Sequence, residues 1–197
     1  MSQLEVNQTE AGQTEARMHW TTADLELLPE NGKRYEIIDG ELLVTRAPRW
    51  THQRAISRIC SVLEFWSDET GLGEVVPGAG IIFTDSDNVI PDVVWISKER
   101  LSVALDRAEH LTIAPELVVE VVSPGAENDR RDRQLKLRLY SVQGVQEYWI
   151  VDLELKQIQI YRRENVALVL ATTLLSGDQI VSPLLPGFNC TVNRIFS

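Results

Sequence analysis

The run of residues 117–122, LVVEVV, is the feature that most restricts how this chain can fold. It is almost entirely apolar and β-branched, as expected for a strand that is buried on both faces of a sheet. A helical pattern follows over about residues 129–143 and ends at Gly144, and residues 147–151 again have the pattern of a strand. A strand, a helix and a strand in this order form a crossover unit with parallel strands. We therefore expect residues 117–122 to lie at the centre of a sheet.

Elements of both kinds are predicted on either side of this unit. They are, in chain order, a hairpin over residues 34–38 and 41–44, a helix over about 52–67, an antiparallel strand pair over 75–83 and 89–96, and a hairpin over 158–161 and 166–175. The pair Asp39-Gly40 favours a type I′ turn in the first hairpin. The predicted class is mixed α/β, a central mixed sheet flanked by helices with additional N- and C-terminal hairpins.

The charge of the chain is unevenly distributed. Twenty-nine acidic and nineteen basic residues give a formal net charge of −10, which argues against a protein that coats nucleic acid through a basic surface. Residues 1–30 alone hold six acidic residues and one basic residue, so half of the excess lies there. Residues 1–18 contain little to bury and are predicted to be a disordered acidic tail. Residues 19–197 are predicted to form a single domain.

The sequence also indicates where the protein resides. Its apolar stretches are shorter than the roughly 18 residues that a membrane helix needs, and we expect no Sec-type leader, because the first twenty residues hold Glu5, Glu10 and Glu15 and no apolar run. Cys60 and Cys190 are far apart and form no CxxC motif, so both are expected to be reduced. We expect a cytoplasmic protein that does not contact a membrane.

Two carboxylates, Asp92 and Glu120, interrupt strands that otherwise have a buried pattern. An unpaired buried carboxylate costs several kcal/mol or is forced to take up a proton, so each needs a metal ion, a basic partner or a proton. Either one alone could be a strand-end residue that reaches solvent or forms a salt bridge. On neighbouring strands, with a backbone carbonyl between them, they would supply the oxygen ligands that Mg²⁺ prefers.

Lys136 is a third candidate, on the predicted crossover helix. At 100° per residue it lies within the stripe that contains Leu139 and Tyr140 and faces the sheet. Three readings remain open at this point: the lysine snorkels out to solvent, pairs with Asp132 one turn earlier, or points at the two carboxylates.

Taken in order, these residues resemble a known family. The motifs are Pro91-Asp92, Glu120 in a strand that leads to Ser123-Pro124, Asp129, Lys136, Tyr140, Gly144 and Glu147-Tyr148-Trp149. They are similar to the Uma family of predicted restriction endonucleases, a former domain of unknown function within the PD-(D/E)xK nuclease superfamily. The resemblance covers roughly residues 20–195 and implies a restriction-endonuclease-like core.

The resemblance also implies a site. Asp92 and Glu120 would bind Mg²⁺ or Mn²⁺ together with the backbone carbonyl of Val121 and, directly or through water, Glu36. The position that holds a lysine in the superfamily is Val122 here, and Lys136 would replace that lysine as the third catalytic residue. The minor candidates are His52 and Tyr140.

The implied function is metal-dependent hydrolysis of DNA phosphodiester bonds by a homodimer. Arg130, Arg131 and Arg133 could contact phosphates beside the site, or could form the solvated face of a helix. Val122 and the acidic charge leave an alternative, a catalytically inactive nuclease-fold protein that acts as a dimeric binding or regulatory module. An unrelated hydrolase is a weaker third hypothesis, because GxSxG, HExxH and P-loop motifs are absent.

Overall fold

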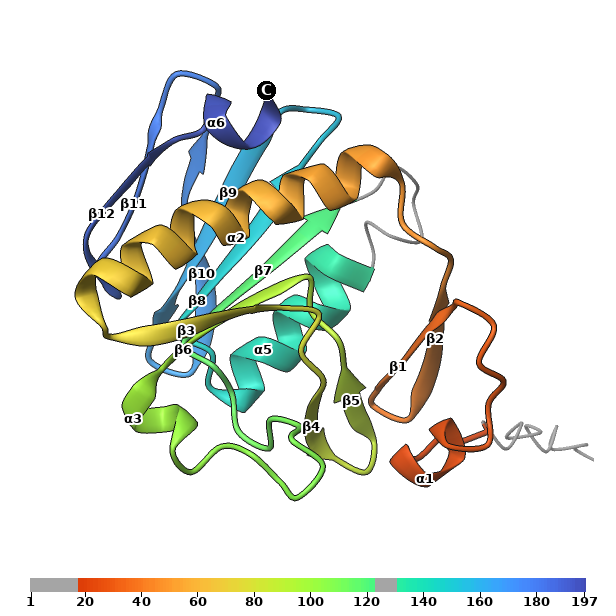
Figure 1. The fold of residues 1–197 in the computed structure, drawn as a ribbon. Coiled ribbons are helices and arrows are strands. Elements are labelled where there is room, and N and C mark those ends of the chain that lie inside the picture. Colours follow the sequence, from red (N-terminus) through yellow and green to blue (C-terminus); the bar gives the residue numbers. More distant parts are fainter. Residues whose placement is uncertain (1–17, 123–130) are drawn as a thin grey trace, which may run out of the picture.

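The computed structural model describes residues 18–122 and 131–197 (Figure 1). The predicted disordered tail lies outside the described residues except for Met18. The single domain predicted for residues 19–197 stays a prediction.

The principal sheet has six strands in the order β10-β9-β8-β7-β6-β3. Its strands are β3 (Gly73–Pro77), β6 (Val93–Ser97), β7 (Leu117–Val122), β8 (Glu147–Asp152), β9 (Gln157–Glu164) and β10 (Ala167–Leu174). All six residues of β7 are buried, and β7 pairs in parallel with β8 and antiparallel with β6. The predicted central strand and its crossover to a parallel partner are therefore confirmed.

The two faces of this sheet are covered by different helices. The long helix α2 (Trp50–Thr70) runs along one face (Figure 1), where its apolar side chains join Val119 and Val121 in one core cluster. On the other face, α5 (Leu137–Gln143) packs in a second cluster that includes Val118 and Val122. Because side chains alternate along a strand, Glu120 lies on the α5 face.

The antiparallel pair predicted over residues 75–83 and 89–96 is divided between two sheets. The expectation of two continuous strands is therefore wrong. The first run forms β3 and β4 (Ile81–Thr84), and the second forms β5 (Asp87–Val89) and β6. The first run is interrupted at Gly78, which has a φ of 67°, and the second at Pro91, which cannot donate to a ladder. Strands β4 and β5 join a four-stranded sheet, and Asp92 lies at the junction between the two sheets.

The other strands of this smaller sheet come from the predicted N-terminal hairpin. Strands β1 (Arg34–Ile38) and β2 (Glu41–Thr45) are antiparallel, and β1 also pairs with β5. Asp39 and Gly40 both have positive φ, as a type I′ turn requires. The pairing with β5 brings β1 beside the start of β6, and with it the side chains of Arg34 and Glu36.

The crossover helix is only partly α-helical. Residues 131–136 form a π-helical segment, η1 (Arg131–Lys136), before α5 begins, and the first residues of the predicted helix lie outside the described range. The assumed 100° per residue therefore applies only from Leu137 onward. Short π-helical segments occur frequently at functional sites.

The remaining elements are short, apart from the predicted C-terminal hairpin β9–β10, which is confirmed. They are α1 (Thr22–Leu25), α3 (Lys98–Leu101), the pair β11 (Gln179–Ser182) and β12 (Leu185–Thr191), and α6 (Asn193–Phe196). The β11–β12 pair is not predicted by the sequence, and its apolar residues join the core cluster beneath α2. Among the described helices, none is long and apolar enough to cross a membrane.

Candidate active site

Asp92 is a buried carboxylate whose two oxygens contact three different elements. Its side chain is 4% exposed. Arg34 of β1 donates from Nη1 to Oδ1 at 3.1 Å, and the backbone N–H of Val121 in β7 donates to Oδ2 at 2.8 Å. Nε2 of His52, in the first turn of α2, lies 3.1 Å from Oδ2. Three segments that are distant in the sequence therefore meet at one carboxylate.

These contacts keep Asp92 ionised. Burial alone would raise its pKa, but the hydrogen bond and charge of His52, the amide of Val121 and the charge of Lys136 outweigh it and hold the pKa at about 2. This value lies below the roughly 3.9 expected for an unfolded chain, so ionised Asp92 stabilises the fold above about pH 4. That stabilisation is lost as the pH falls through about 2.

We therefore expect the free energy of unfolding of Asp92→Asn to depend less on pH in the acid range than that of the wild type. The wild type should lose about 2 to 3 kcal/mol of stability between about pH 5 and pH 2 through this group alone, and the variant should lack that component. Urea unfolding at a series of pH values measures the difference. Parallel curves for the two proteins over this range would contradict the assignment.

Lys136 lies between two further carboxylates. Its Nζ is 2.8 Å from Oε1 of Glu120 in β7 and 2.9 Å from Oε1 of Glu36 in β1, and the lysine and both acids are almost completely buried. Tyr140, one turn along the helix, donates from its hydroxyl to the same oxygen of Glu120 at 3.0 Å. The backbone N–H of Ile90 donates to Glu36 Oε1 at 2.9 Å. The lysine therefore points at the carboxylates and does not snorkel out to solvent.

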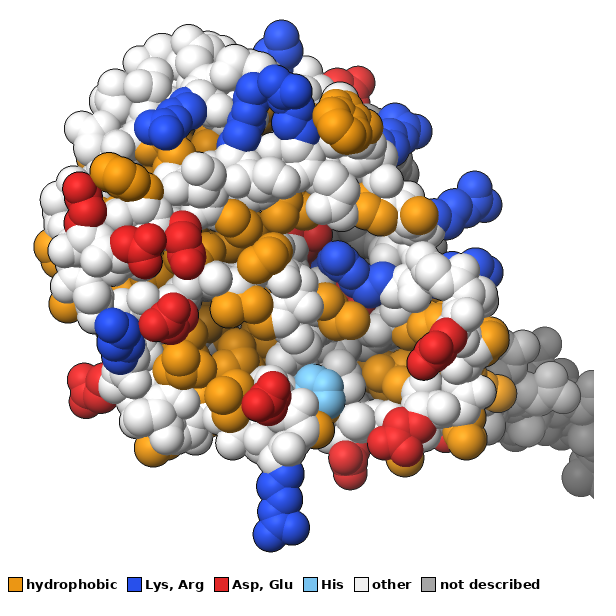
Figure 2. All heavy atoms as spheres, in the orientation of Figure 1, with side chains coloured by type: hydrophobic (Ala, Val, Ile, Leu, Met, Phe, Trp, Pro, Cys, Tyr) orange, Lys and Arg blue, Asp and Glu red, His pale blue; other side chains and the backbone are white. Residues whose placement is uncertain are grey.

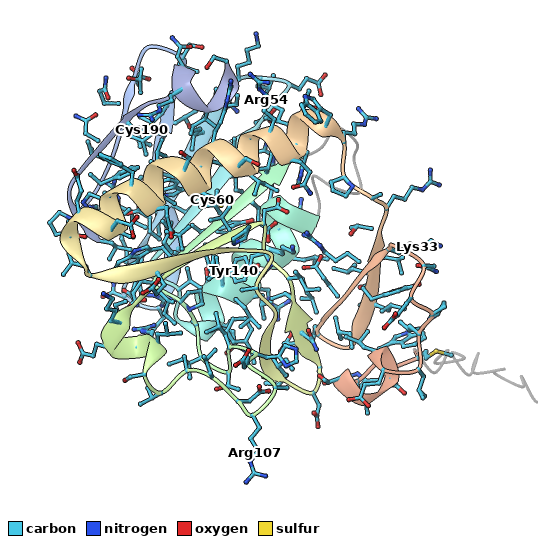
Figure 3. The ribbon with its side chains drawn as sticks, viewed as in Figure 1. Lys33, Arg54, Cys60, Arg107, Tyr140 and Cys190 are labelled. Carbon is cyan, nitrogen blue, oxygen red and sulfur yellow. The ribbon has the colours of Figure 1, made fainter. Side chains whose placement is uncertain are left out.

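Tyr140 is a hydrogen-bond donor that stays protonated in this arrangement. Burial and the nearby carboxylate of Glu120 raise its pKa well above the usual value, so the hydroxyl keeps its proton. Figure 3 shows Tyr140 in the middle of the molecule. Its hydroxyl and the Nζ of Lys136 both donate to the same oxygen of Glu120.

Both sets of contacts meet in one cleft of about 880 Å³. The carboxylates at its base, which we call the floor carboxylates, are Glu36, Asp92 and Glu120. Its walls are the β1–β2 hairpin, the segment that leads into α2, and the end of η1. Figure 2 shows a hollow between the hairpin and the body of the molecule, with basic and acidic side chains gathered at it.

Most of the residues predicted from the sequence are brought together here. The cleft is lined by Glu36, His52, Asp92, Glu120 and Lys136, and Tyr140 contacts Glu120 from the core. Of the three predicted phosphate-contacting arginines only Arg133 has a described side chain, and it does not line the cleft. Arg133 instead donates to Asp152 at 2.5 Å and to Gln159. Arg130 and the side chain of Arg131 lie outside the described residues, as does the side chain of Asp132.

Arg34 is a site residue that the sequence analysis does not identify. It lines the cleft, and its Nη1 also donates to the carbonyl of Ile90 at 3.0 Å. A signal was present, because Arg34 and Glu36 are two positions apart on one strand and therefore point to the same side. The sequence alone does not show that this side faces Asp92, because that depends on the pairing of β1 with β5.

The floor carboxylates have the donor chemistry of a hard divalent cation, since Mg²⁺ and Mn²⁺ favour carboxylate and carbonyl oxygens. In the described residues, however, no group of three His, Cys, Asp or Glu side chains is already arranged to hold a metal ion. Arg34 contacts Oδ1 of Asp92, and His52 and Val121 contact Oδ2. The residues therefore fit a metal ion if Arg34 leaves Oδ1.

The sheet order, the flanking helices and the cleft define a protein of restriction-endonuclease-like fold. The chain belongs to the Uma2 family, whose description is "Putative restriction endonuclease"; the family model matches residues 22–193. A crystal structure from Anabaena variabilis ATCC 29413, of "a putative nuclease belonging to DUF820", superposes with a TM-score of 0.70. The match has 17% identity and covers 89% of this chain and 97% of the other. A search of curated proteins finds no match.

Proposed function

We propose that the protein is a divalent-metal-dependent endonuclease that hydrolyses DNA phosphodiester bonds. The observation that carries the proposal is the buried Lys136, held by Glu36 and Glu120 in the same cleft as Asp92. A buried lysine between two acids costs desolvation energy, and a buried charge with specific charge partners in a cleft is a candidate functional group. Membership of the Uma2 family supports the same reaction class.

Asp92, Glu120 and the Val121 carbonyl would hold the metal ion, with Glu36 as a further ligand, direct or through water. The N–H and C=O of one strand residue point to the same side, so the carbonyl of Val121 faces the side on which its amide meets Asp92. Such an ion lowers the pKa of a bound water and stabilises negative charge on the phosphate.

Lys136 takes the place of the superfamily lysine, whose position is Val122 here. Its ammonium is oriented by Glu120 and Glu36, and Tyr140 fixes Glu120 in turn. From this position Lys136 orients the attacking water and offsets the charge that develops on the phosphate. The π-helical segment η1 ends at Lys136. The lysine therefore reaches the site from the crossover helix, whereas the superfamily lysine reaches it from the strand.

Plasmid cleavage tests the proposal. The purified full chain should convert supercoiled DNA to nicked and linear forms with Mg²⁺ or Mn²⁺, and should leave it intact with EDTA. Cleavage that persists in EDTA would contradict the metal dependence. Light scattering would test the homodimer proposed from the family resemblance, since a monomeric mass would contradict it.

One observation favours the alternative, a nuclease-fold protein that binds without catalysis. Asp92 is already satisfied by Arg34, His52 and the Val121 amide, an arrangement that needs no metal ion. The two functions differ in metal affinity.

We expect Arg34→Ala to tighten Mn²⁺ binding by about 10- to 150-fold, because a charged hydrogen bond of about 1.5 to 3 kcal/mol no longer has to be broken. Calorimetric titration of wild type and variant measures the change. Glu120→Ala is the matched control and should abolish binding. Absence of Mn²⁺ binding in both wild type and Arg34→Ala would favour the non-catalytic protein.

A further inference from the structure

The rim of the cleft has a different charge from its floor. The floor carboxylates are buried and paired with basic side chains. Lys33, Arg46 and Arg49 also line the cleft, but they are exposed and form no ion pair with any residue in the described ranges. They come from both sides of the β1–β2 hairpin, where the chain enters β1 and where it leaves β2 for α2. Glu41 is the one acidic lining residue that is not fully buried, so three exposed cations outnumber it and the opening of the cleft is basic.

This basic rim stands out because the chain as a whole carries a formal charge of −10. A polyanion is repelled by most of such a surface and is attracted where exposed cations are concentrated. Nucleic-acid phosphates that approach the floor carboxylates have to pass this opening. The floor carboxylates are already paired with basic side chains. They therefore repel an approaching phosphate less than three unpaired carboxylates would.

An exposed tryptophan lies beside the rim. Trp50 is the first residue of α2, directly after Arg49, and 78% of its surface is exposed. It is three positions from Gln53, which lines the cleft, so the two share a side of the helix. An exposed tryptophan next to cations is a platform on which an unpaired base can stack. In a duplex the bases are stacked on one another, so this contact favours a single strand.

We propose that Lys33, Arg46, Arg49 and Trp50, which we call the rim track, bind single-stranded DNA, with the cations on phosphates and Trp50 stacked on a base. The inference rests on the proposed function, because it names the form of DNA that reaches the floor carboxylates. The site thus prefers unpaired segments, such as single strands, flaps or frayed ends, over intact duplex.

Fluorescence anisotropy in EDTA tests the rim track without cleavage. The probes are a labelled oligothymidine of about 12 nucleotides, within the usual span of such sites, and a hairpin duplex of matched length. The single strand should bind more tightly. Trp50→Ala should weaken its binding by about 5- to 150-fold, the range for loss of one stacked base, and Trp50→Phe should retain most of it.

The cations are tested by salt dependence. Arg46→Ala and Arg49→Ala should each reduce the slope of log affinity against log salt by about 0.7 for a single strand. Arg107 is a matched control, since it is exposed and projects away from the hairpin (Figure 3), and Arg107→Ala should leave the slope unchanged.

The rim track is overturned if the duplex binds as tightly as the single strand, if Trp50→Ala binds as well as wild type, or if the wild type binds neither probe. These outcomes are separate from failure of the proposed hydrolysis. Single-strand binding without plasmid cleavage would contradict the proposed hydrolysis and support the rim track. Plasmid cleavage together with unaltered single-strand binding by the variants would support the hydrolysis and contradict the rim track.

Discussion

Asp92→Asn is expected to reduce the rate of DNA cleavage by at least about 100-fold, comparable to the loss of one charge-stabilising group in other hydrolases. The substitution keeps the size of the side chain and removes its charge. Asparagine can still accept from the amide of Val121, but it presents an NH₂ group where a metal ion or Arg34 needs an oxygen. Initial rates of plasmid nicking in Mg²⁺ measure the effect.

A matched control separates this loss from a general effect of charge. Glu99 is an exposed carboxylate on α3 that does not line the cleft, so Glu99→Gln should cleave at the wild-type rate. Thermal unfolding at pH 7 shows whether Asp92→Asn is folded at the assay temperature. A folded Asp92→Asn protein with wild-type activity would remove Asp92 from the mechanism.

Lys136→Met is expected to lower the free energy of unfolding by about 3 to 5 kcal/mol, the usual cost of removing one partner from a buried ion pair. Methionine fills similar space, so little of the loss comes from a cavity. The cost arises because Glu36 and Glu120 then share a buried space without a cation between them. This expectation concerns stability only and holds whether or not the protein cleaves DNA. Urea unfolding at pH 7 measures it.

The double variant Lys136→Met/Glu120→Gln is the control for this interpretation. It removes one of the two carboxylates, so its stability should exceed that of Lys136→Met by at least about 1 kcal/mol, a non-additive effect expected for contacting groups. Glu36 keeps the amide of Ile90 as a hydrogen-bond partner in both proteins. If Lys136→Met alone costs less than about 1 kcal/mol, the lysine is not the buried partner that its contacts indicate.

The charge separation between floor and rim would reconcile an acidic chain with the nucleic-acid substrate that we propose. The floor carboxylates are paired with Arg34, His52 and Lys136, and the exposed cations stand at the opening. Net charge counts all of these groups together with the N-terminal residues. It therefore describes long-range repulsion well and the local field of the cleft poorly.

The successful fold predictions share a local cause. The crossover from β7 to β8 follows from a continuous β-branched run, a helical pattern and a second strand, each visible within a short window. The hairpin of β1 and β2 follows from the Asp39-Gly40 turn. The errors occurred where the arrangement of the strands depends on pairing or packing with distant segments. Residues 75–83 and 89–96 each contribute to two sheets, and β11–β12 form a pair that is stabilised by packing beneath α2.

The sequence by itself determined which residues are the candidates for chemistry: Asp92 and Glu120 interrupt buried strands, and Lys136 lies on the sheet-facing side of the following helix. Their unusual polarity in apolar surroundings is a local property, because burial of a charge requires a partner wherever it occurs. Only the tertiary structure decided what those partners are. Arg34 and Glu36 reach Asp92 and Lys136 because β1 pairs with β5, a contact between segments about fifty positions apart. Such a pairing depends on register and packing, which no short stretch of sequence contains.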